Sequence, residues 1–505
     1  MNTALSMAFS SVALDPFVWL LIFIGVAVGI VFGAIPGLTA TMAILMFLPM
    51  TYTMIPIQGI SMLVSLYIGG ISGGLISAIL LNIPGTPSSV ATCFEGSPMA
   101  RRGDAAKALG LGIVFSFLGT IIGVAVLVVI SPLLAELAIK FGAYEYCALA
   151  VFSLSLVIAL TGKDIVKGLI SAVFGALIAT VGLAPLDSSA RFTFNNYNLT
   201  GGFKLVAFLI GLFAITEVIA YARESRNPSR FEIKTNFKFK GFGFSIKEFF
   251  DQIINMLRSA MIGIGIGILP GIGGGVSCML AYTVAKNSSR KPELFGTGIN
   301  DGIVASETAN NATIGGAMIP LLALGIPGDA VTAILLGGFM VHDIAPGPLI
   351  FQKNGVVVYG IFIAMVIASF AMLILEFGGI RLFMRLLKIP KHYLLPVVVV
   401  LCAVGAIGDS NRVFDMWGML LFGLVGCGML SAGVPLTPMI LGFILGPMFE
   451  TNLRRVSQLF VQNNFSLFSR PIALIFLAVT IITVVMNIRA SKKAHEAEML
   501  KADIK

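Results

Sequence analysis

Two long apolar stretches of the chain are interrupted by the same kind of proline-glycine sequence. GAIPG interrupts the first at residues 33–37, and GILPG interrupts the second at residues 267–271. A second interruption follows in each half, with NIPGTP at residues 82–87 and GIPGD at residues 325–329. Backbone that leaves helical geometry at membrane depth is tolerated only where protein or a water-filled cavity satisfies its N–H and C=O groups. Paired interruptions of this kind predict the binding site of a secondary transporter.

The hydrophobic pattern predicts an all-α polytopic membrane protein. Apolar stretches of roughly 20 residues, enough to cross a hydrocarbon core of ~30 Å, recur along the whole chain. We expect about 12 transmembrane segments, several of them too short or too rich in glycine and proline to cross as straight helices. These segments are predicted to be broken or re-entrant helices.

The distribution of basic residues predicts the orientation. Lys and Arg concentrate on the cytoplasmic side of membrane proteins. The first of them is Arg101, so we expect the N-terminus outside, whereas Lys492 and Lys493 predict a cytoplasmic C-terminus. Arg454 and Arg455 fall on the expected outer side, which departs from the rule unless the protein binds them.

The longest charged stretch predicts a cytoplasmic linker between two halves. Residues 223–252 are basic and contain alternating aromatic side chains, which suit contact with the membrane surface or, equally, a solvated loop. These aromatic residues are Phe237, Phe239, Phe242 and Phe244.

The order of the interruptions predicts an internal repeat. We expect a first membrane repeat over residues 1–222, the linker over 223–252, a second repeat over 253–488 and a cytoplasmic tail over 489–505. The first half begins outside and the second inside, so the two halves are predicted to be inverted-topology repeats.

Composition agrees with a membrane protein and excludes several other classes. The chain is 57% hydrophobic and 11% charged, and its mean hydropathy is +0.98. Its net charge of +9 lies in loops between apolar segments, so no nucleic acid partner is expected. Five scattered cysteines without a Cys-x-x-Cys pair and three dispersed histidines predict neither a metal framework nor a cofactor.

The first candidate binding segment covers residues 82–92. Small hydroxyls and an amide around two prolines suit an anion such as a carboxylate, because free N–H groups at a half-helix start replace its water. An ordinary helix cap and turn would use the same residues. The candidates for substrate binding here are Asn82, Pro84, Gly85, Thr86, Ser88 and Ser89, joined by Thr39 after the first interruption.

The second candidate segment covers residues 325–332. Asp329 is an acid in apolar sequence, and intramembrane ionisable residues are functional by default. It could ligate sodium with neighbouring carbonyls, carry a proton, or cap a half-helix. Pro327, Gly328 and Thr332 are further candidates for substrate binding.

A third segment, ETANNAT at residues 307–313, clusters amide and hydroxyl oxygens before a glycine pair. Oxygen ligands suit sodium, a hard cation. Asn310 and Asn311 could instead donate to a carboxylate, and hydrogen bonding between helices is the alternative role for the whole segment. The candidate sodium ligands are Asp329, Thr313 and Thr41.

These motifs resemble the large membrane subunit (TctA-type) of the tripartite tricarboxylate transporters. The resemblance covers essentially the whole chain, and Glu307 with Thr308 is a local departure from the family pattern. It is carried by GAIPGLT at 33–39, IPGTPSS at 83–89, PMAR at 98–101, ANNA at 309–312, GGAMIP at 315–320, GIPGDAVT at 325–332 and LGPMFE at 445–450.

The resemblance implies a multi-pass permease of the bacterial inner membrane, so the outer side, where the N-terminus is expected, is the periplasm. It implies two partners, a small four-helix membrane subunit and a periplasmic substrate-binding protein. It also implies symport of small organic di- or tricarboxylates such as citrate, driven by sodium or protons.

Alternating access is the mechanism that the sequence favours. An anion channel, which would conduct without its partners or a cation gradient, is an alternative. An intramembrane aspartyl protease built on Asp329 and Asp409 is a second one, although Asp409 falls in a predicted external loop. We therefore expect a transporter rather than an enzyme.

Overall fold

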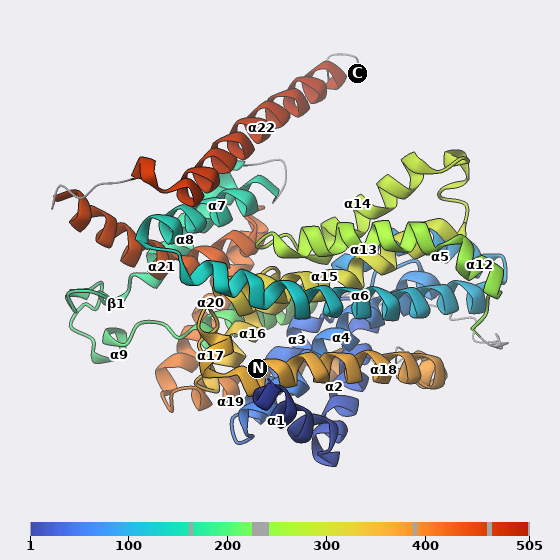
Figure 1. The fold of residues 1–505 in the computed structure, drawn as a ribbon, viewed down its shortest axis with the longest axis horizontal. Coiled ribbons are helices and arrows are strands. Elements are labelled where there is room, and N and C mark those ends of the chain that lie inside the picture. Colours follow the sequence, from blue (N-terminus) through green and yellow to red (C-terminus); the bar gives the residue numbers. More distant parts are fainter. Residues whose placement is uncertain (1, 161–164, 225–241, 387–390, 462–466, 503–505) are drawn as a thin grey trace. The chain divides into compact units, whose positions relative to one another are not determined.

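The computed structural model describes residues 2–160, 165–224, 242–386, 391–461 and 467–502. These residues are almost entirely helical (Figure 1). One short ribbon interrupts the helices, formed by β1 (Gly182–Leu183) and β2 (Ala190–Arg191), which pair antiparallel with Gly182 opposite Arg191. The all-α prediction is therefore confirmed.

Five helices of the described residues are long and apolar enough to cross a membrane. They are α2 (Pro16–Ala34), α4 (Pro56–Leu81), α6 (Ala105–Ile139), α18 (Gly355–Leu386) and α20 (Val413–Ser431). Shorter apolar helices of 10–17 residues accompany them. The chain thus has the helices of a multi-pass membrane protein, while the number of 12 spans stays a prediction.

The helices form two compact units that are not continuous in sequence. The first combines Met1–Glu136 with Phe213–Asn411, and the second combines Leu137–Leu212 with Arg412–Lys505. The repeat boundaries at residues 222 and 253 stay predictions. Residues 225–241 of the predicted linker, with Phe237 and Phe239, lie outside the described residues.

The first unit contains the same succession of elements twice. Each series has four helices, with one interruption between the first and second and another between the third and fourth. A long helix, α6 or α18, follows each series. The first series is α2, α3 (Ala40–Thr51), α4, and η1 (Pro87–Ser89) leading into α5 (Val90–Arg101). The second is α13 (Ile253–Ile268), α14 (Gly273–Ser288), α15 (Asn300–Leu324) and α16 (Ala330–Val341).

Glycines let the first and third helices of each series pack closely. A Cβ on Gly29 of α2 would lie 2.5 Å from the Leu66 carbonyl oxygen of α4. In the second series, a Cβ on Gly263 of α13 would lie 2.2 Å from the Ala309 carbonyl oxygen of α15. Small residues allow such backbone contact between helices in lipid.

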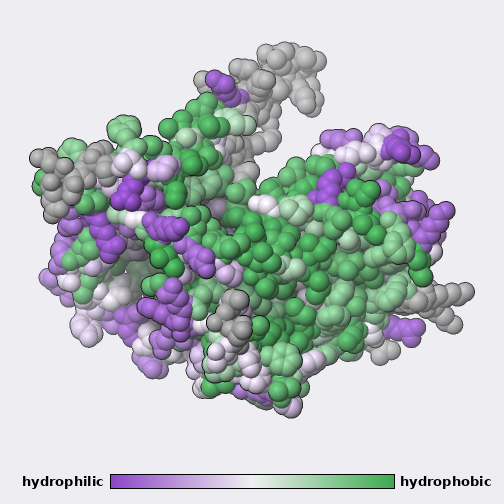
Figure 2. Space-filling model, in the orientation of Figure 1, coloured by the Kyte–Doolittle hydropathy of each residue, from purple (hydrophilic) through white to green (hydrophobic). Residues whose placement is uncertain are grey.

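The remaining elements of the first unit surround these two series. Helix α18 packs on α1, α2 and α4, and α19 packs on α3. Over α6, α13 and α18, the face seen in Figure 2 is predominantly hydrophobic, as expected of a surface in contact with lipid. The other elements are α1 (Asn2–Ala13), α11 (Thr216–Glu224), α12 (Ile246–Asp251), η3 (Pro292–Leu294), α17 (Ile350–Lys353) and α19 (Lys391–Gly408), and η2 (Ile210–Ile215) crosses the boundary between the units.

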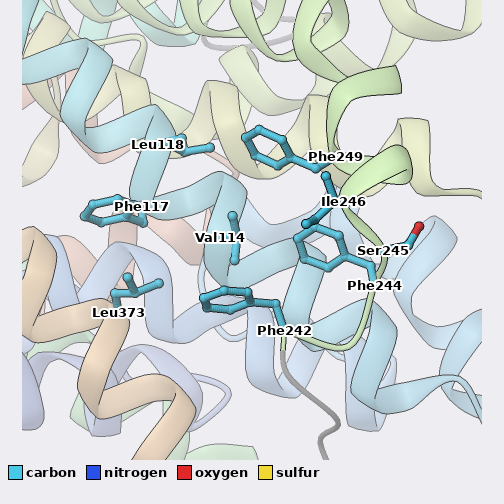
Figure 3. A pocket seen from close by; sticks show the side chains of 9 residues that line it. All are labelled: Val114, Phe117, Leu118, Phe242, Phe244, Ser245, Ile246, Phe249 and Leu373. Atoms are coloured by element: carbon cyan, nitrogen blue, oxygen red, sulfur yellow. The ribbon is translucent and has the colours of Figure 1, made fainter.

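The end of the predicted linker packs on protein. Phe244 contacts Phe115 of α6, and Phe242 contacts Phe377 of α18, with ring centroids 6.3 and 5.3 Å apart. Both line an apolar cavity of about 320 Å³ between these helices and α12 (Figure 3). The described phenylalanines of this stretch therefore contact helices of the first unit, in addition to any contact with a membrane surface.

An ion pair holds α12 beside this cavity. Glu248 of α12 pairs with Lys107 of α6. Its carboxylate also accepts a hydrogen bond from the backbone N–H of Ser245 (2.9 Å). The Lys107 ammonium and the Ser245 donor lower the pKa of Glu248 to about 2, so this carboxyl is ionised at neutral pH.

The second unit is a helical bundle in which α8 packs on α21 and α22 packs on α7. Arg454 pairs there with Glu450 (2.9 Å) and Asp187 (3.1 Å), so the protein does bind this arginine of the expected outer side. The elements of this unit are α7 (Ala143–Leu160), α8 (Ile165–Ala179), α9 (Tyr197–Thr200), α10 (Leu205–Leu209), α20, α21 (Leu436–Val461), η4 (Leu467–Ser469) and α22 (Pro471–Ala502), with the β1–β2 ribbon.

Candidate functional site

The two interruptions of each series lie against each other. A Cβ on Gly85 would lie 2.1 Å from the Gly33 carbonyl oxygen, and one on Gly328 would lie 2.5 Å from the Gly267 carbonyl oxygen. Only a residue without a side chain permits this approach. The two proline-glycine interruptions of each series are therefore in contact with each other.

Polar side chains cap the helices that begin at these points. Thr39 accepts a hydrogen bond from the Met42 N–H at the start of α3 (3.3 Å). Thr86 and Ser89 bond reciprocally at the start of η1, where the Thr86 N–H donates to Ser89 Oγ (3.2 Å). The capping role considered for these residues is therefore present in the structure.

The start of α14 brings the two series together. A Cβ on Gly273 would lie 3.2 Å from Asp329 Cβ, on the second interruption of the same series. A Cβ on Gly274 would lie 2.6 Å from Asn310 Oδ1 and 3.0 Å from Ser88 Cβ. The first turn of α14 therefore lies between Asp329 on one side and Ser88 with Asn310 on the other.

Asn310 is the unusual member of this group. Its side chain is 1% exposed, and neither its Oδ1 nor its Nδ2 has a hydrogen-bond partner among the described residues. The amide lies within polar reach of the Glu307 carboxyl, without the geometry of a hydrogen bond. Buried polar groups are nearly always satisfied, so this amide requires an explanation.

Asp329 is fully engaged by the protein. Its carboxylate accepts hydrogen bonds from the Thr332 N–H (2.7 Å), the Thr332 hydroxyl (2.7 Å) and the Tyr67 hydroxyl (2.5 Å). These bonds cap α16 and join it to α4 of the first series. Sequence reasoning missed Tyr67, because an aromatic residue in an apolar helix gives no sign of its distant partner.

The three candidate sodium ligands have separate partners. Thr313 bonds with Ser277 (2.7 Å) and donates to the Ala309 carbonyl (2.8 Å), and Thr41 bonds with Thr39 (2.5 Å). Among the described residues, no group of three or more His, Cys, Asp or Glu side chains could hold a metal ion. The sodium assignment stays a prediction.

The other residues predicted to bind substrate differ in exposure and in their hydrogen-bond partners. Asn82 is exposed and ends α4 in a left-handed conformation (φ 57°), while Pro84 is half-buried. Pro327 and Gly328 are buried in the second interruption. Asn311 donates to the Ser116 hydroxyl of α6 (2.9 Å), so its amide, unlike that of Asn310, has a hydrogen-bond partner.

Ser116 belongs to a cluster around Glu307, whose role the sequence left open. Glu307 is fully buried on α15 and accepts hydrogen bonds from Thr92 of α5 and from Ser116 (3.0 Å). A second acid, Glu376 of α18, is also fully buried, and neither of its carboxyl oxygens has a partner among the described residues. Sequence reasoning missed Glu376, although an acid within an apolar helix is a recognisable signal.

The two aspartates of the alternative protease reading have separate surroundings. Asp329 bonds with Tyr67 and Thr332, whereas Asp409 follows α19 and lies beside Tyr52. An aspartyl protease requires two carboxyls that share one proton. The described contacts provide no such pair for Asp329.

Comparison with known proteins identifies the family. Residues 19–441 match the tripartite tricarboxylate transporter TctA family. The chain is 35% identical over 488 residues to the "Uncharacterized 52.8 kDa protein in TAR-I ttuC' 3'region" of Agrobacterium vitis, with 96% of each chain covered. It is 32% identical over 239 residues to the "Uncharacterized protein in TAR-II ttuC' 3'region" of the same organism, covering 47% of this chain and 98% of that protein.

No solved structure matches the chain. The family match covers both series of broken helices and confirms the resemblance seen in the motifs. The chain belongs to the tripartite tricarboxylate transporter TctA family and is a multi-pass membrane component of a transport system.

Proposed function

We propose that this chain is the permease of a binding-protein-dependent secondary transporter, which imports small di- or tricarboxylates by cation symport. The observation that carries the proposal is the first turn of α14, with the unpartnered Asn310 amide and the Ser88 hydroxyl beside it. Backbone N–H groups at a helix start and neutral donors together replace the water around a carboxylate.

Glycine makes this helix start accessible to a ligand. Residues 273–275 of α14 are all glycine, so none of them has a side chain of its own over these N–H groups. Pro87, next to Ser88, is exposed, and the Gly274 and Gly275 positions are half-buried, so the group reaches the protein surface. Asn310 would then donate one hydrogen bond to the carboxylate and satisfy its own buried amide.

Nearby acids make cation coupling chemically sensible. Asp329 and Glu307 both lie near this helix start, and an anionic substrate beside a carboxylate is repelled unless a cation or proton intervenes. Sodium and protons are both suitable coupling ions on this ground.

Matched contacts between the series support inverted repeats and alternating access. Tyr67 precedes Asn82, the C-cap of α4, by 15 residues, and Asn310 precedes Gly325, the C-cap of α15, by 15 residues. Tyr67 reaches Asp329 of the second series, and Asn310 lies near Ser88 of the first. Such reciprocal placement is what two related halves around one central site would give.

The proposed setting follows from the family. A tripartite system requires further subunits, for which we propose a small four-helix membrane protein and a periplasmic substrate-binding protein. We place the permease in the bacterial inner membrane with a periplasmic N-terminus and a cytoplasmic C-terminus, because Lys and Arg are absent before Arg101 and recur near the chain end.

The test is depletion of a mixed carboxylate pool by cells that express the permease with both partners, followed by mass spectrometry. We expect one class of acid to disappear from the medium only when this chain is present, and only with an inward cation gradient. Depletion that ignores every cation gradient would indicate a channel. No depletion of any acid, with all three subunits assembled, would refute the proposal.

A further inference from the structure

Glu376 lies in surroundings that do not favour its charged form. Its side chain is fully buried in α18, and neither oxygen has a hydrogen-bond partner among the described residues. Ser72 of α4 faces it, but the Ser72 hydroxyl lies 3.3 Å from Met372 Sδ, one turn earlier in α18. An ionised carboxylate with so little compensation is strongly unfavourable in a membrane helix.

Another buried acid shows how this protein stabilises a carboxylate. Glu95 accepts hydrogen bonds from the Tyr282 hydroxyl (2.8 Å) and from the N–H groups of Gly296, Gly298 and Ile299 (2.6, 2.7 and 3.0 Å). Four donors compensate the loss of water around that group. Glu376 has no comparable set of donors among the described residues, so its surroundings differ from those of a carboxylate that is held as an anion.

The acid whose charge acts on Glu376 is Glu307 of α15. Two carboxyls in one buried region do not ionise together without a compensating cation. Helices α1, α2 and α4, which pack against α18, contain no charged side chain. The other titratable groups of the neighbouring elements are Tyr67 on α4, Lys107 and Glu136 on α6, Lys247, Glu248 and Asp251 on α12 (Glu248 paired with Lys107), Lys353 on α17, and Tyr359, Arg381 and Arg385 on α18 itself.

The surroundings suit a proton better than a metal ion. Sodium requires several oxygen ligands, whereas the oxygen groups that act on Glu376 are the Ser72 hydroxyl and the Glu307 carboxyl. A proton needs only the carboxyl oxygen itself. Glu307, which has donors from Thr92 and Ser116, is the member of the pair better able to stay charged.

We propose that Glu376 is the binding site of the coupling proton, with Glu307 linking it to the substrate. The inference rests on the proposed function. Glu376 takes a proton from hydronium on the outer side, so an O–H bond of hydronium breaks and an O–H bond forms at one carboxyl oxygen. After the change of access that carboxyl O–H bond breaks, and the proton passes to cytoplasmic water and forms hydronium. No electron is transferred.

The link to the substrate is short. Asn310 lies one turn after Glu307 on α15, and its amide is within polar reach of the Glu307 carboxyl. A carboxylate bound at Asn310 adds negative charge beside the two acids, which favours retention of the proton on Glu376. Proton and substrate therefore bind cooperatively and cross together.

Infrared spectroscopy of the purified full chain tests the site without transport. A protonated buried carboxyl gives a C=O stretch that shifts in D₂O. We expect that band at neutral pH, its loss in Glu376→Gln, and its retention in Glu136→Gln, which changes an exposed acid of α6. A band that persists in Glu376→Gln would overturn the proposal.

Transport by proteoliposomes with both partners tests the coupling. With the membrane potential held at zero, an inside-alkaline gradient of one pH unit supports about tenfold accumulation per coupled proton. We expect Glu376→Gln to abolish this accumulation while it retains substrate exchange, and Glu376→Asp to restore accumulation with a shifted pH profile. Retained exchange also shows that the variant is folded.

The outcomes separate the two proposals. Two results would overturn the proton site. One is that the pH gradient drives as much accumulation in Glu376→Gln as in the wild type. The other is that only sodium drives accumulation in the wild type. If the wild type transports no carboxylate but the infrared band behaves as expected, the proposed function fails and the coupling role of Glu376 fails with it, while its protonation stands.

Discussion

At the scale of single residues, three acids of the first unit have three different surroundings. Glu95 is held as an anion by four donors, Asp329 is held as a helix cap by Tyr67 and Thr332, and Glu376 has no partner among the described residues. The amino acid type alone does not distinguish them. The number and kind of donors around each carboxyl decide what it can do.

Asp329 provides the prediction at this scale. Asp329→Asn keeps an oxygen that can cap α16, so we expect thermal stability and the response of uptake to sodium to stay close to wild type. Asp329→Ala loses the cap, worth about 1 kcal/mol, and leaves the Tyr67 hydroxyl buried without an acceptor, which costs about 1–3 kcal/mol. Thermal unfolding in detergent and a sodium titration of uptake measure both. A changed sodium dependence in Asp329→Asn, with unchanged stability, would make Asp329 an ion ligand.

At the scale of elements, the start of α14 is the structure on which the proposed binding site depends. Its glycines let Asp329, Ser88 and Asn310 approach the first turn from two sides. Gly274 and Gly275 differ in what surrounds them. A Cβ on Gly275 would meet only the carbonyl oxygen and carbonyl carbon of Pro87, at 3.5 and 3.8 Å, which are ordinary contact distances.

This difference predicts the behaviour of two neighbouring variants. Gly274→Ala places a methyl group 2.6 Å from Asn310 Oδ1, so we expect a large rise in the KM for the carboxylate. Gly275→Ala should leave the KM near wild type, and alanine at either position favours the helix by up to about 1 kcal/mol. Uptake kinetics with matched protein levels measure the pair. Equal effects of the two substitutions would remove the helix start from the site.

At the scale of the whole molecule, the sequence predicts the helices and their interruptions, whereas the contacts depend on packing. Proline and glycine identify each break because they act on the local backbone. The reach of Tyr67 to Asp329 depends on how helices pack, and so does the burial of Glu376. Thr313 shows the same limit, since its hydroxyl bonds with Ser277 and shares no partner with the other predicted sodium ligands.

The first unit also joins segments that are far apart in the chain, such as Ser88 with Gly274. The motifs indicated that both regions matter, and the family pattern agreed with them. That the interruptions of the two series meet at one helix start follows only from the tertiary structure. The central claim is therefore that this helix start, with Asn310, binds the carboxylate.

The most direct measurement of this claim is the KM for the transported carboxylate in Asn310→Ala, with kcat measured in the same assay. Loss of a hydrogen bond from a buried group costs about 1–3 kcal/mol, so we expect the KM to rise about fivefold or more. The matched control is Asn452→Ala, which removes a buried amide of the second unit that donates to the Met448 carbonyl (2.8 Å). A KM in Asn310→Ala equal to that of the wild type and the control would contradict the account.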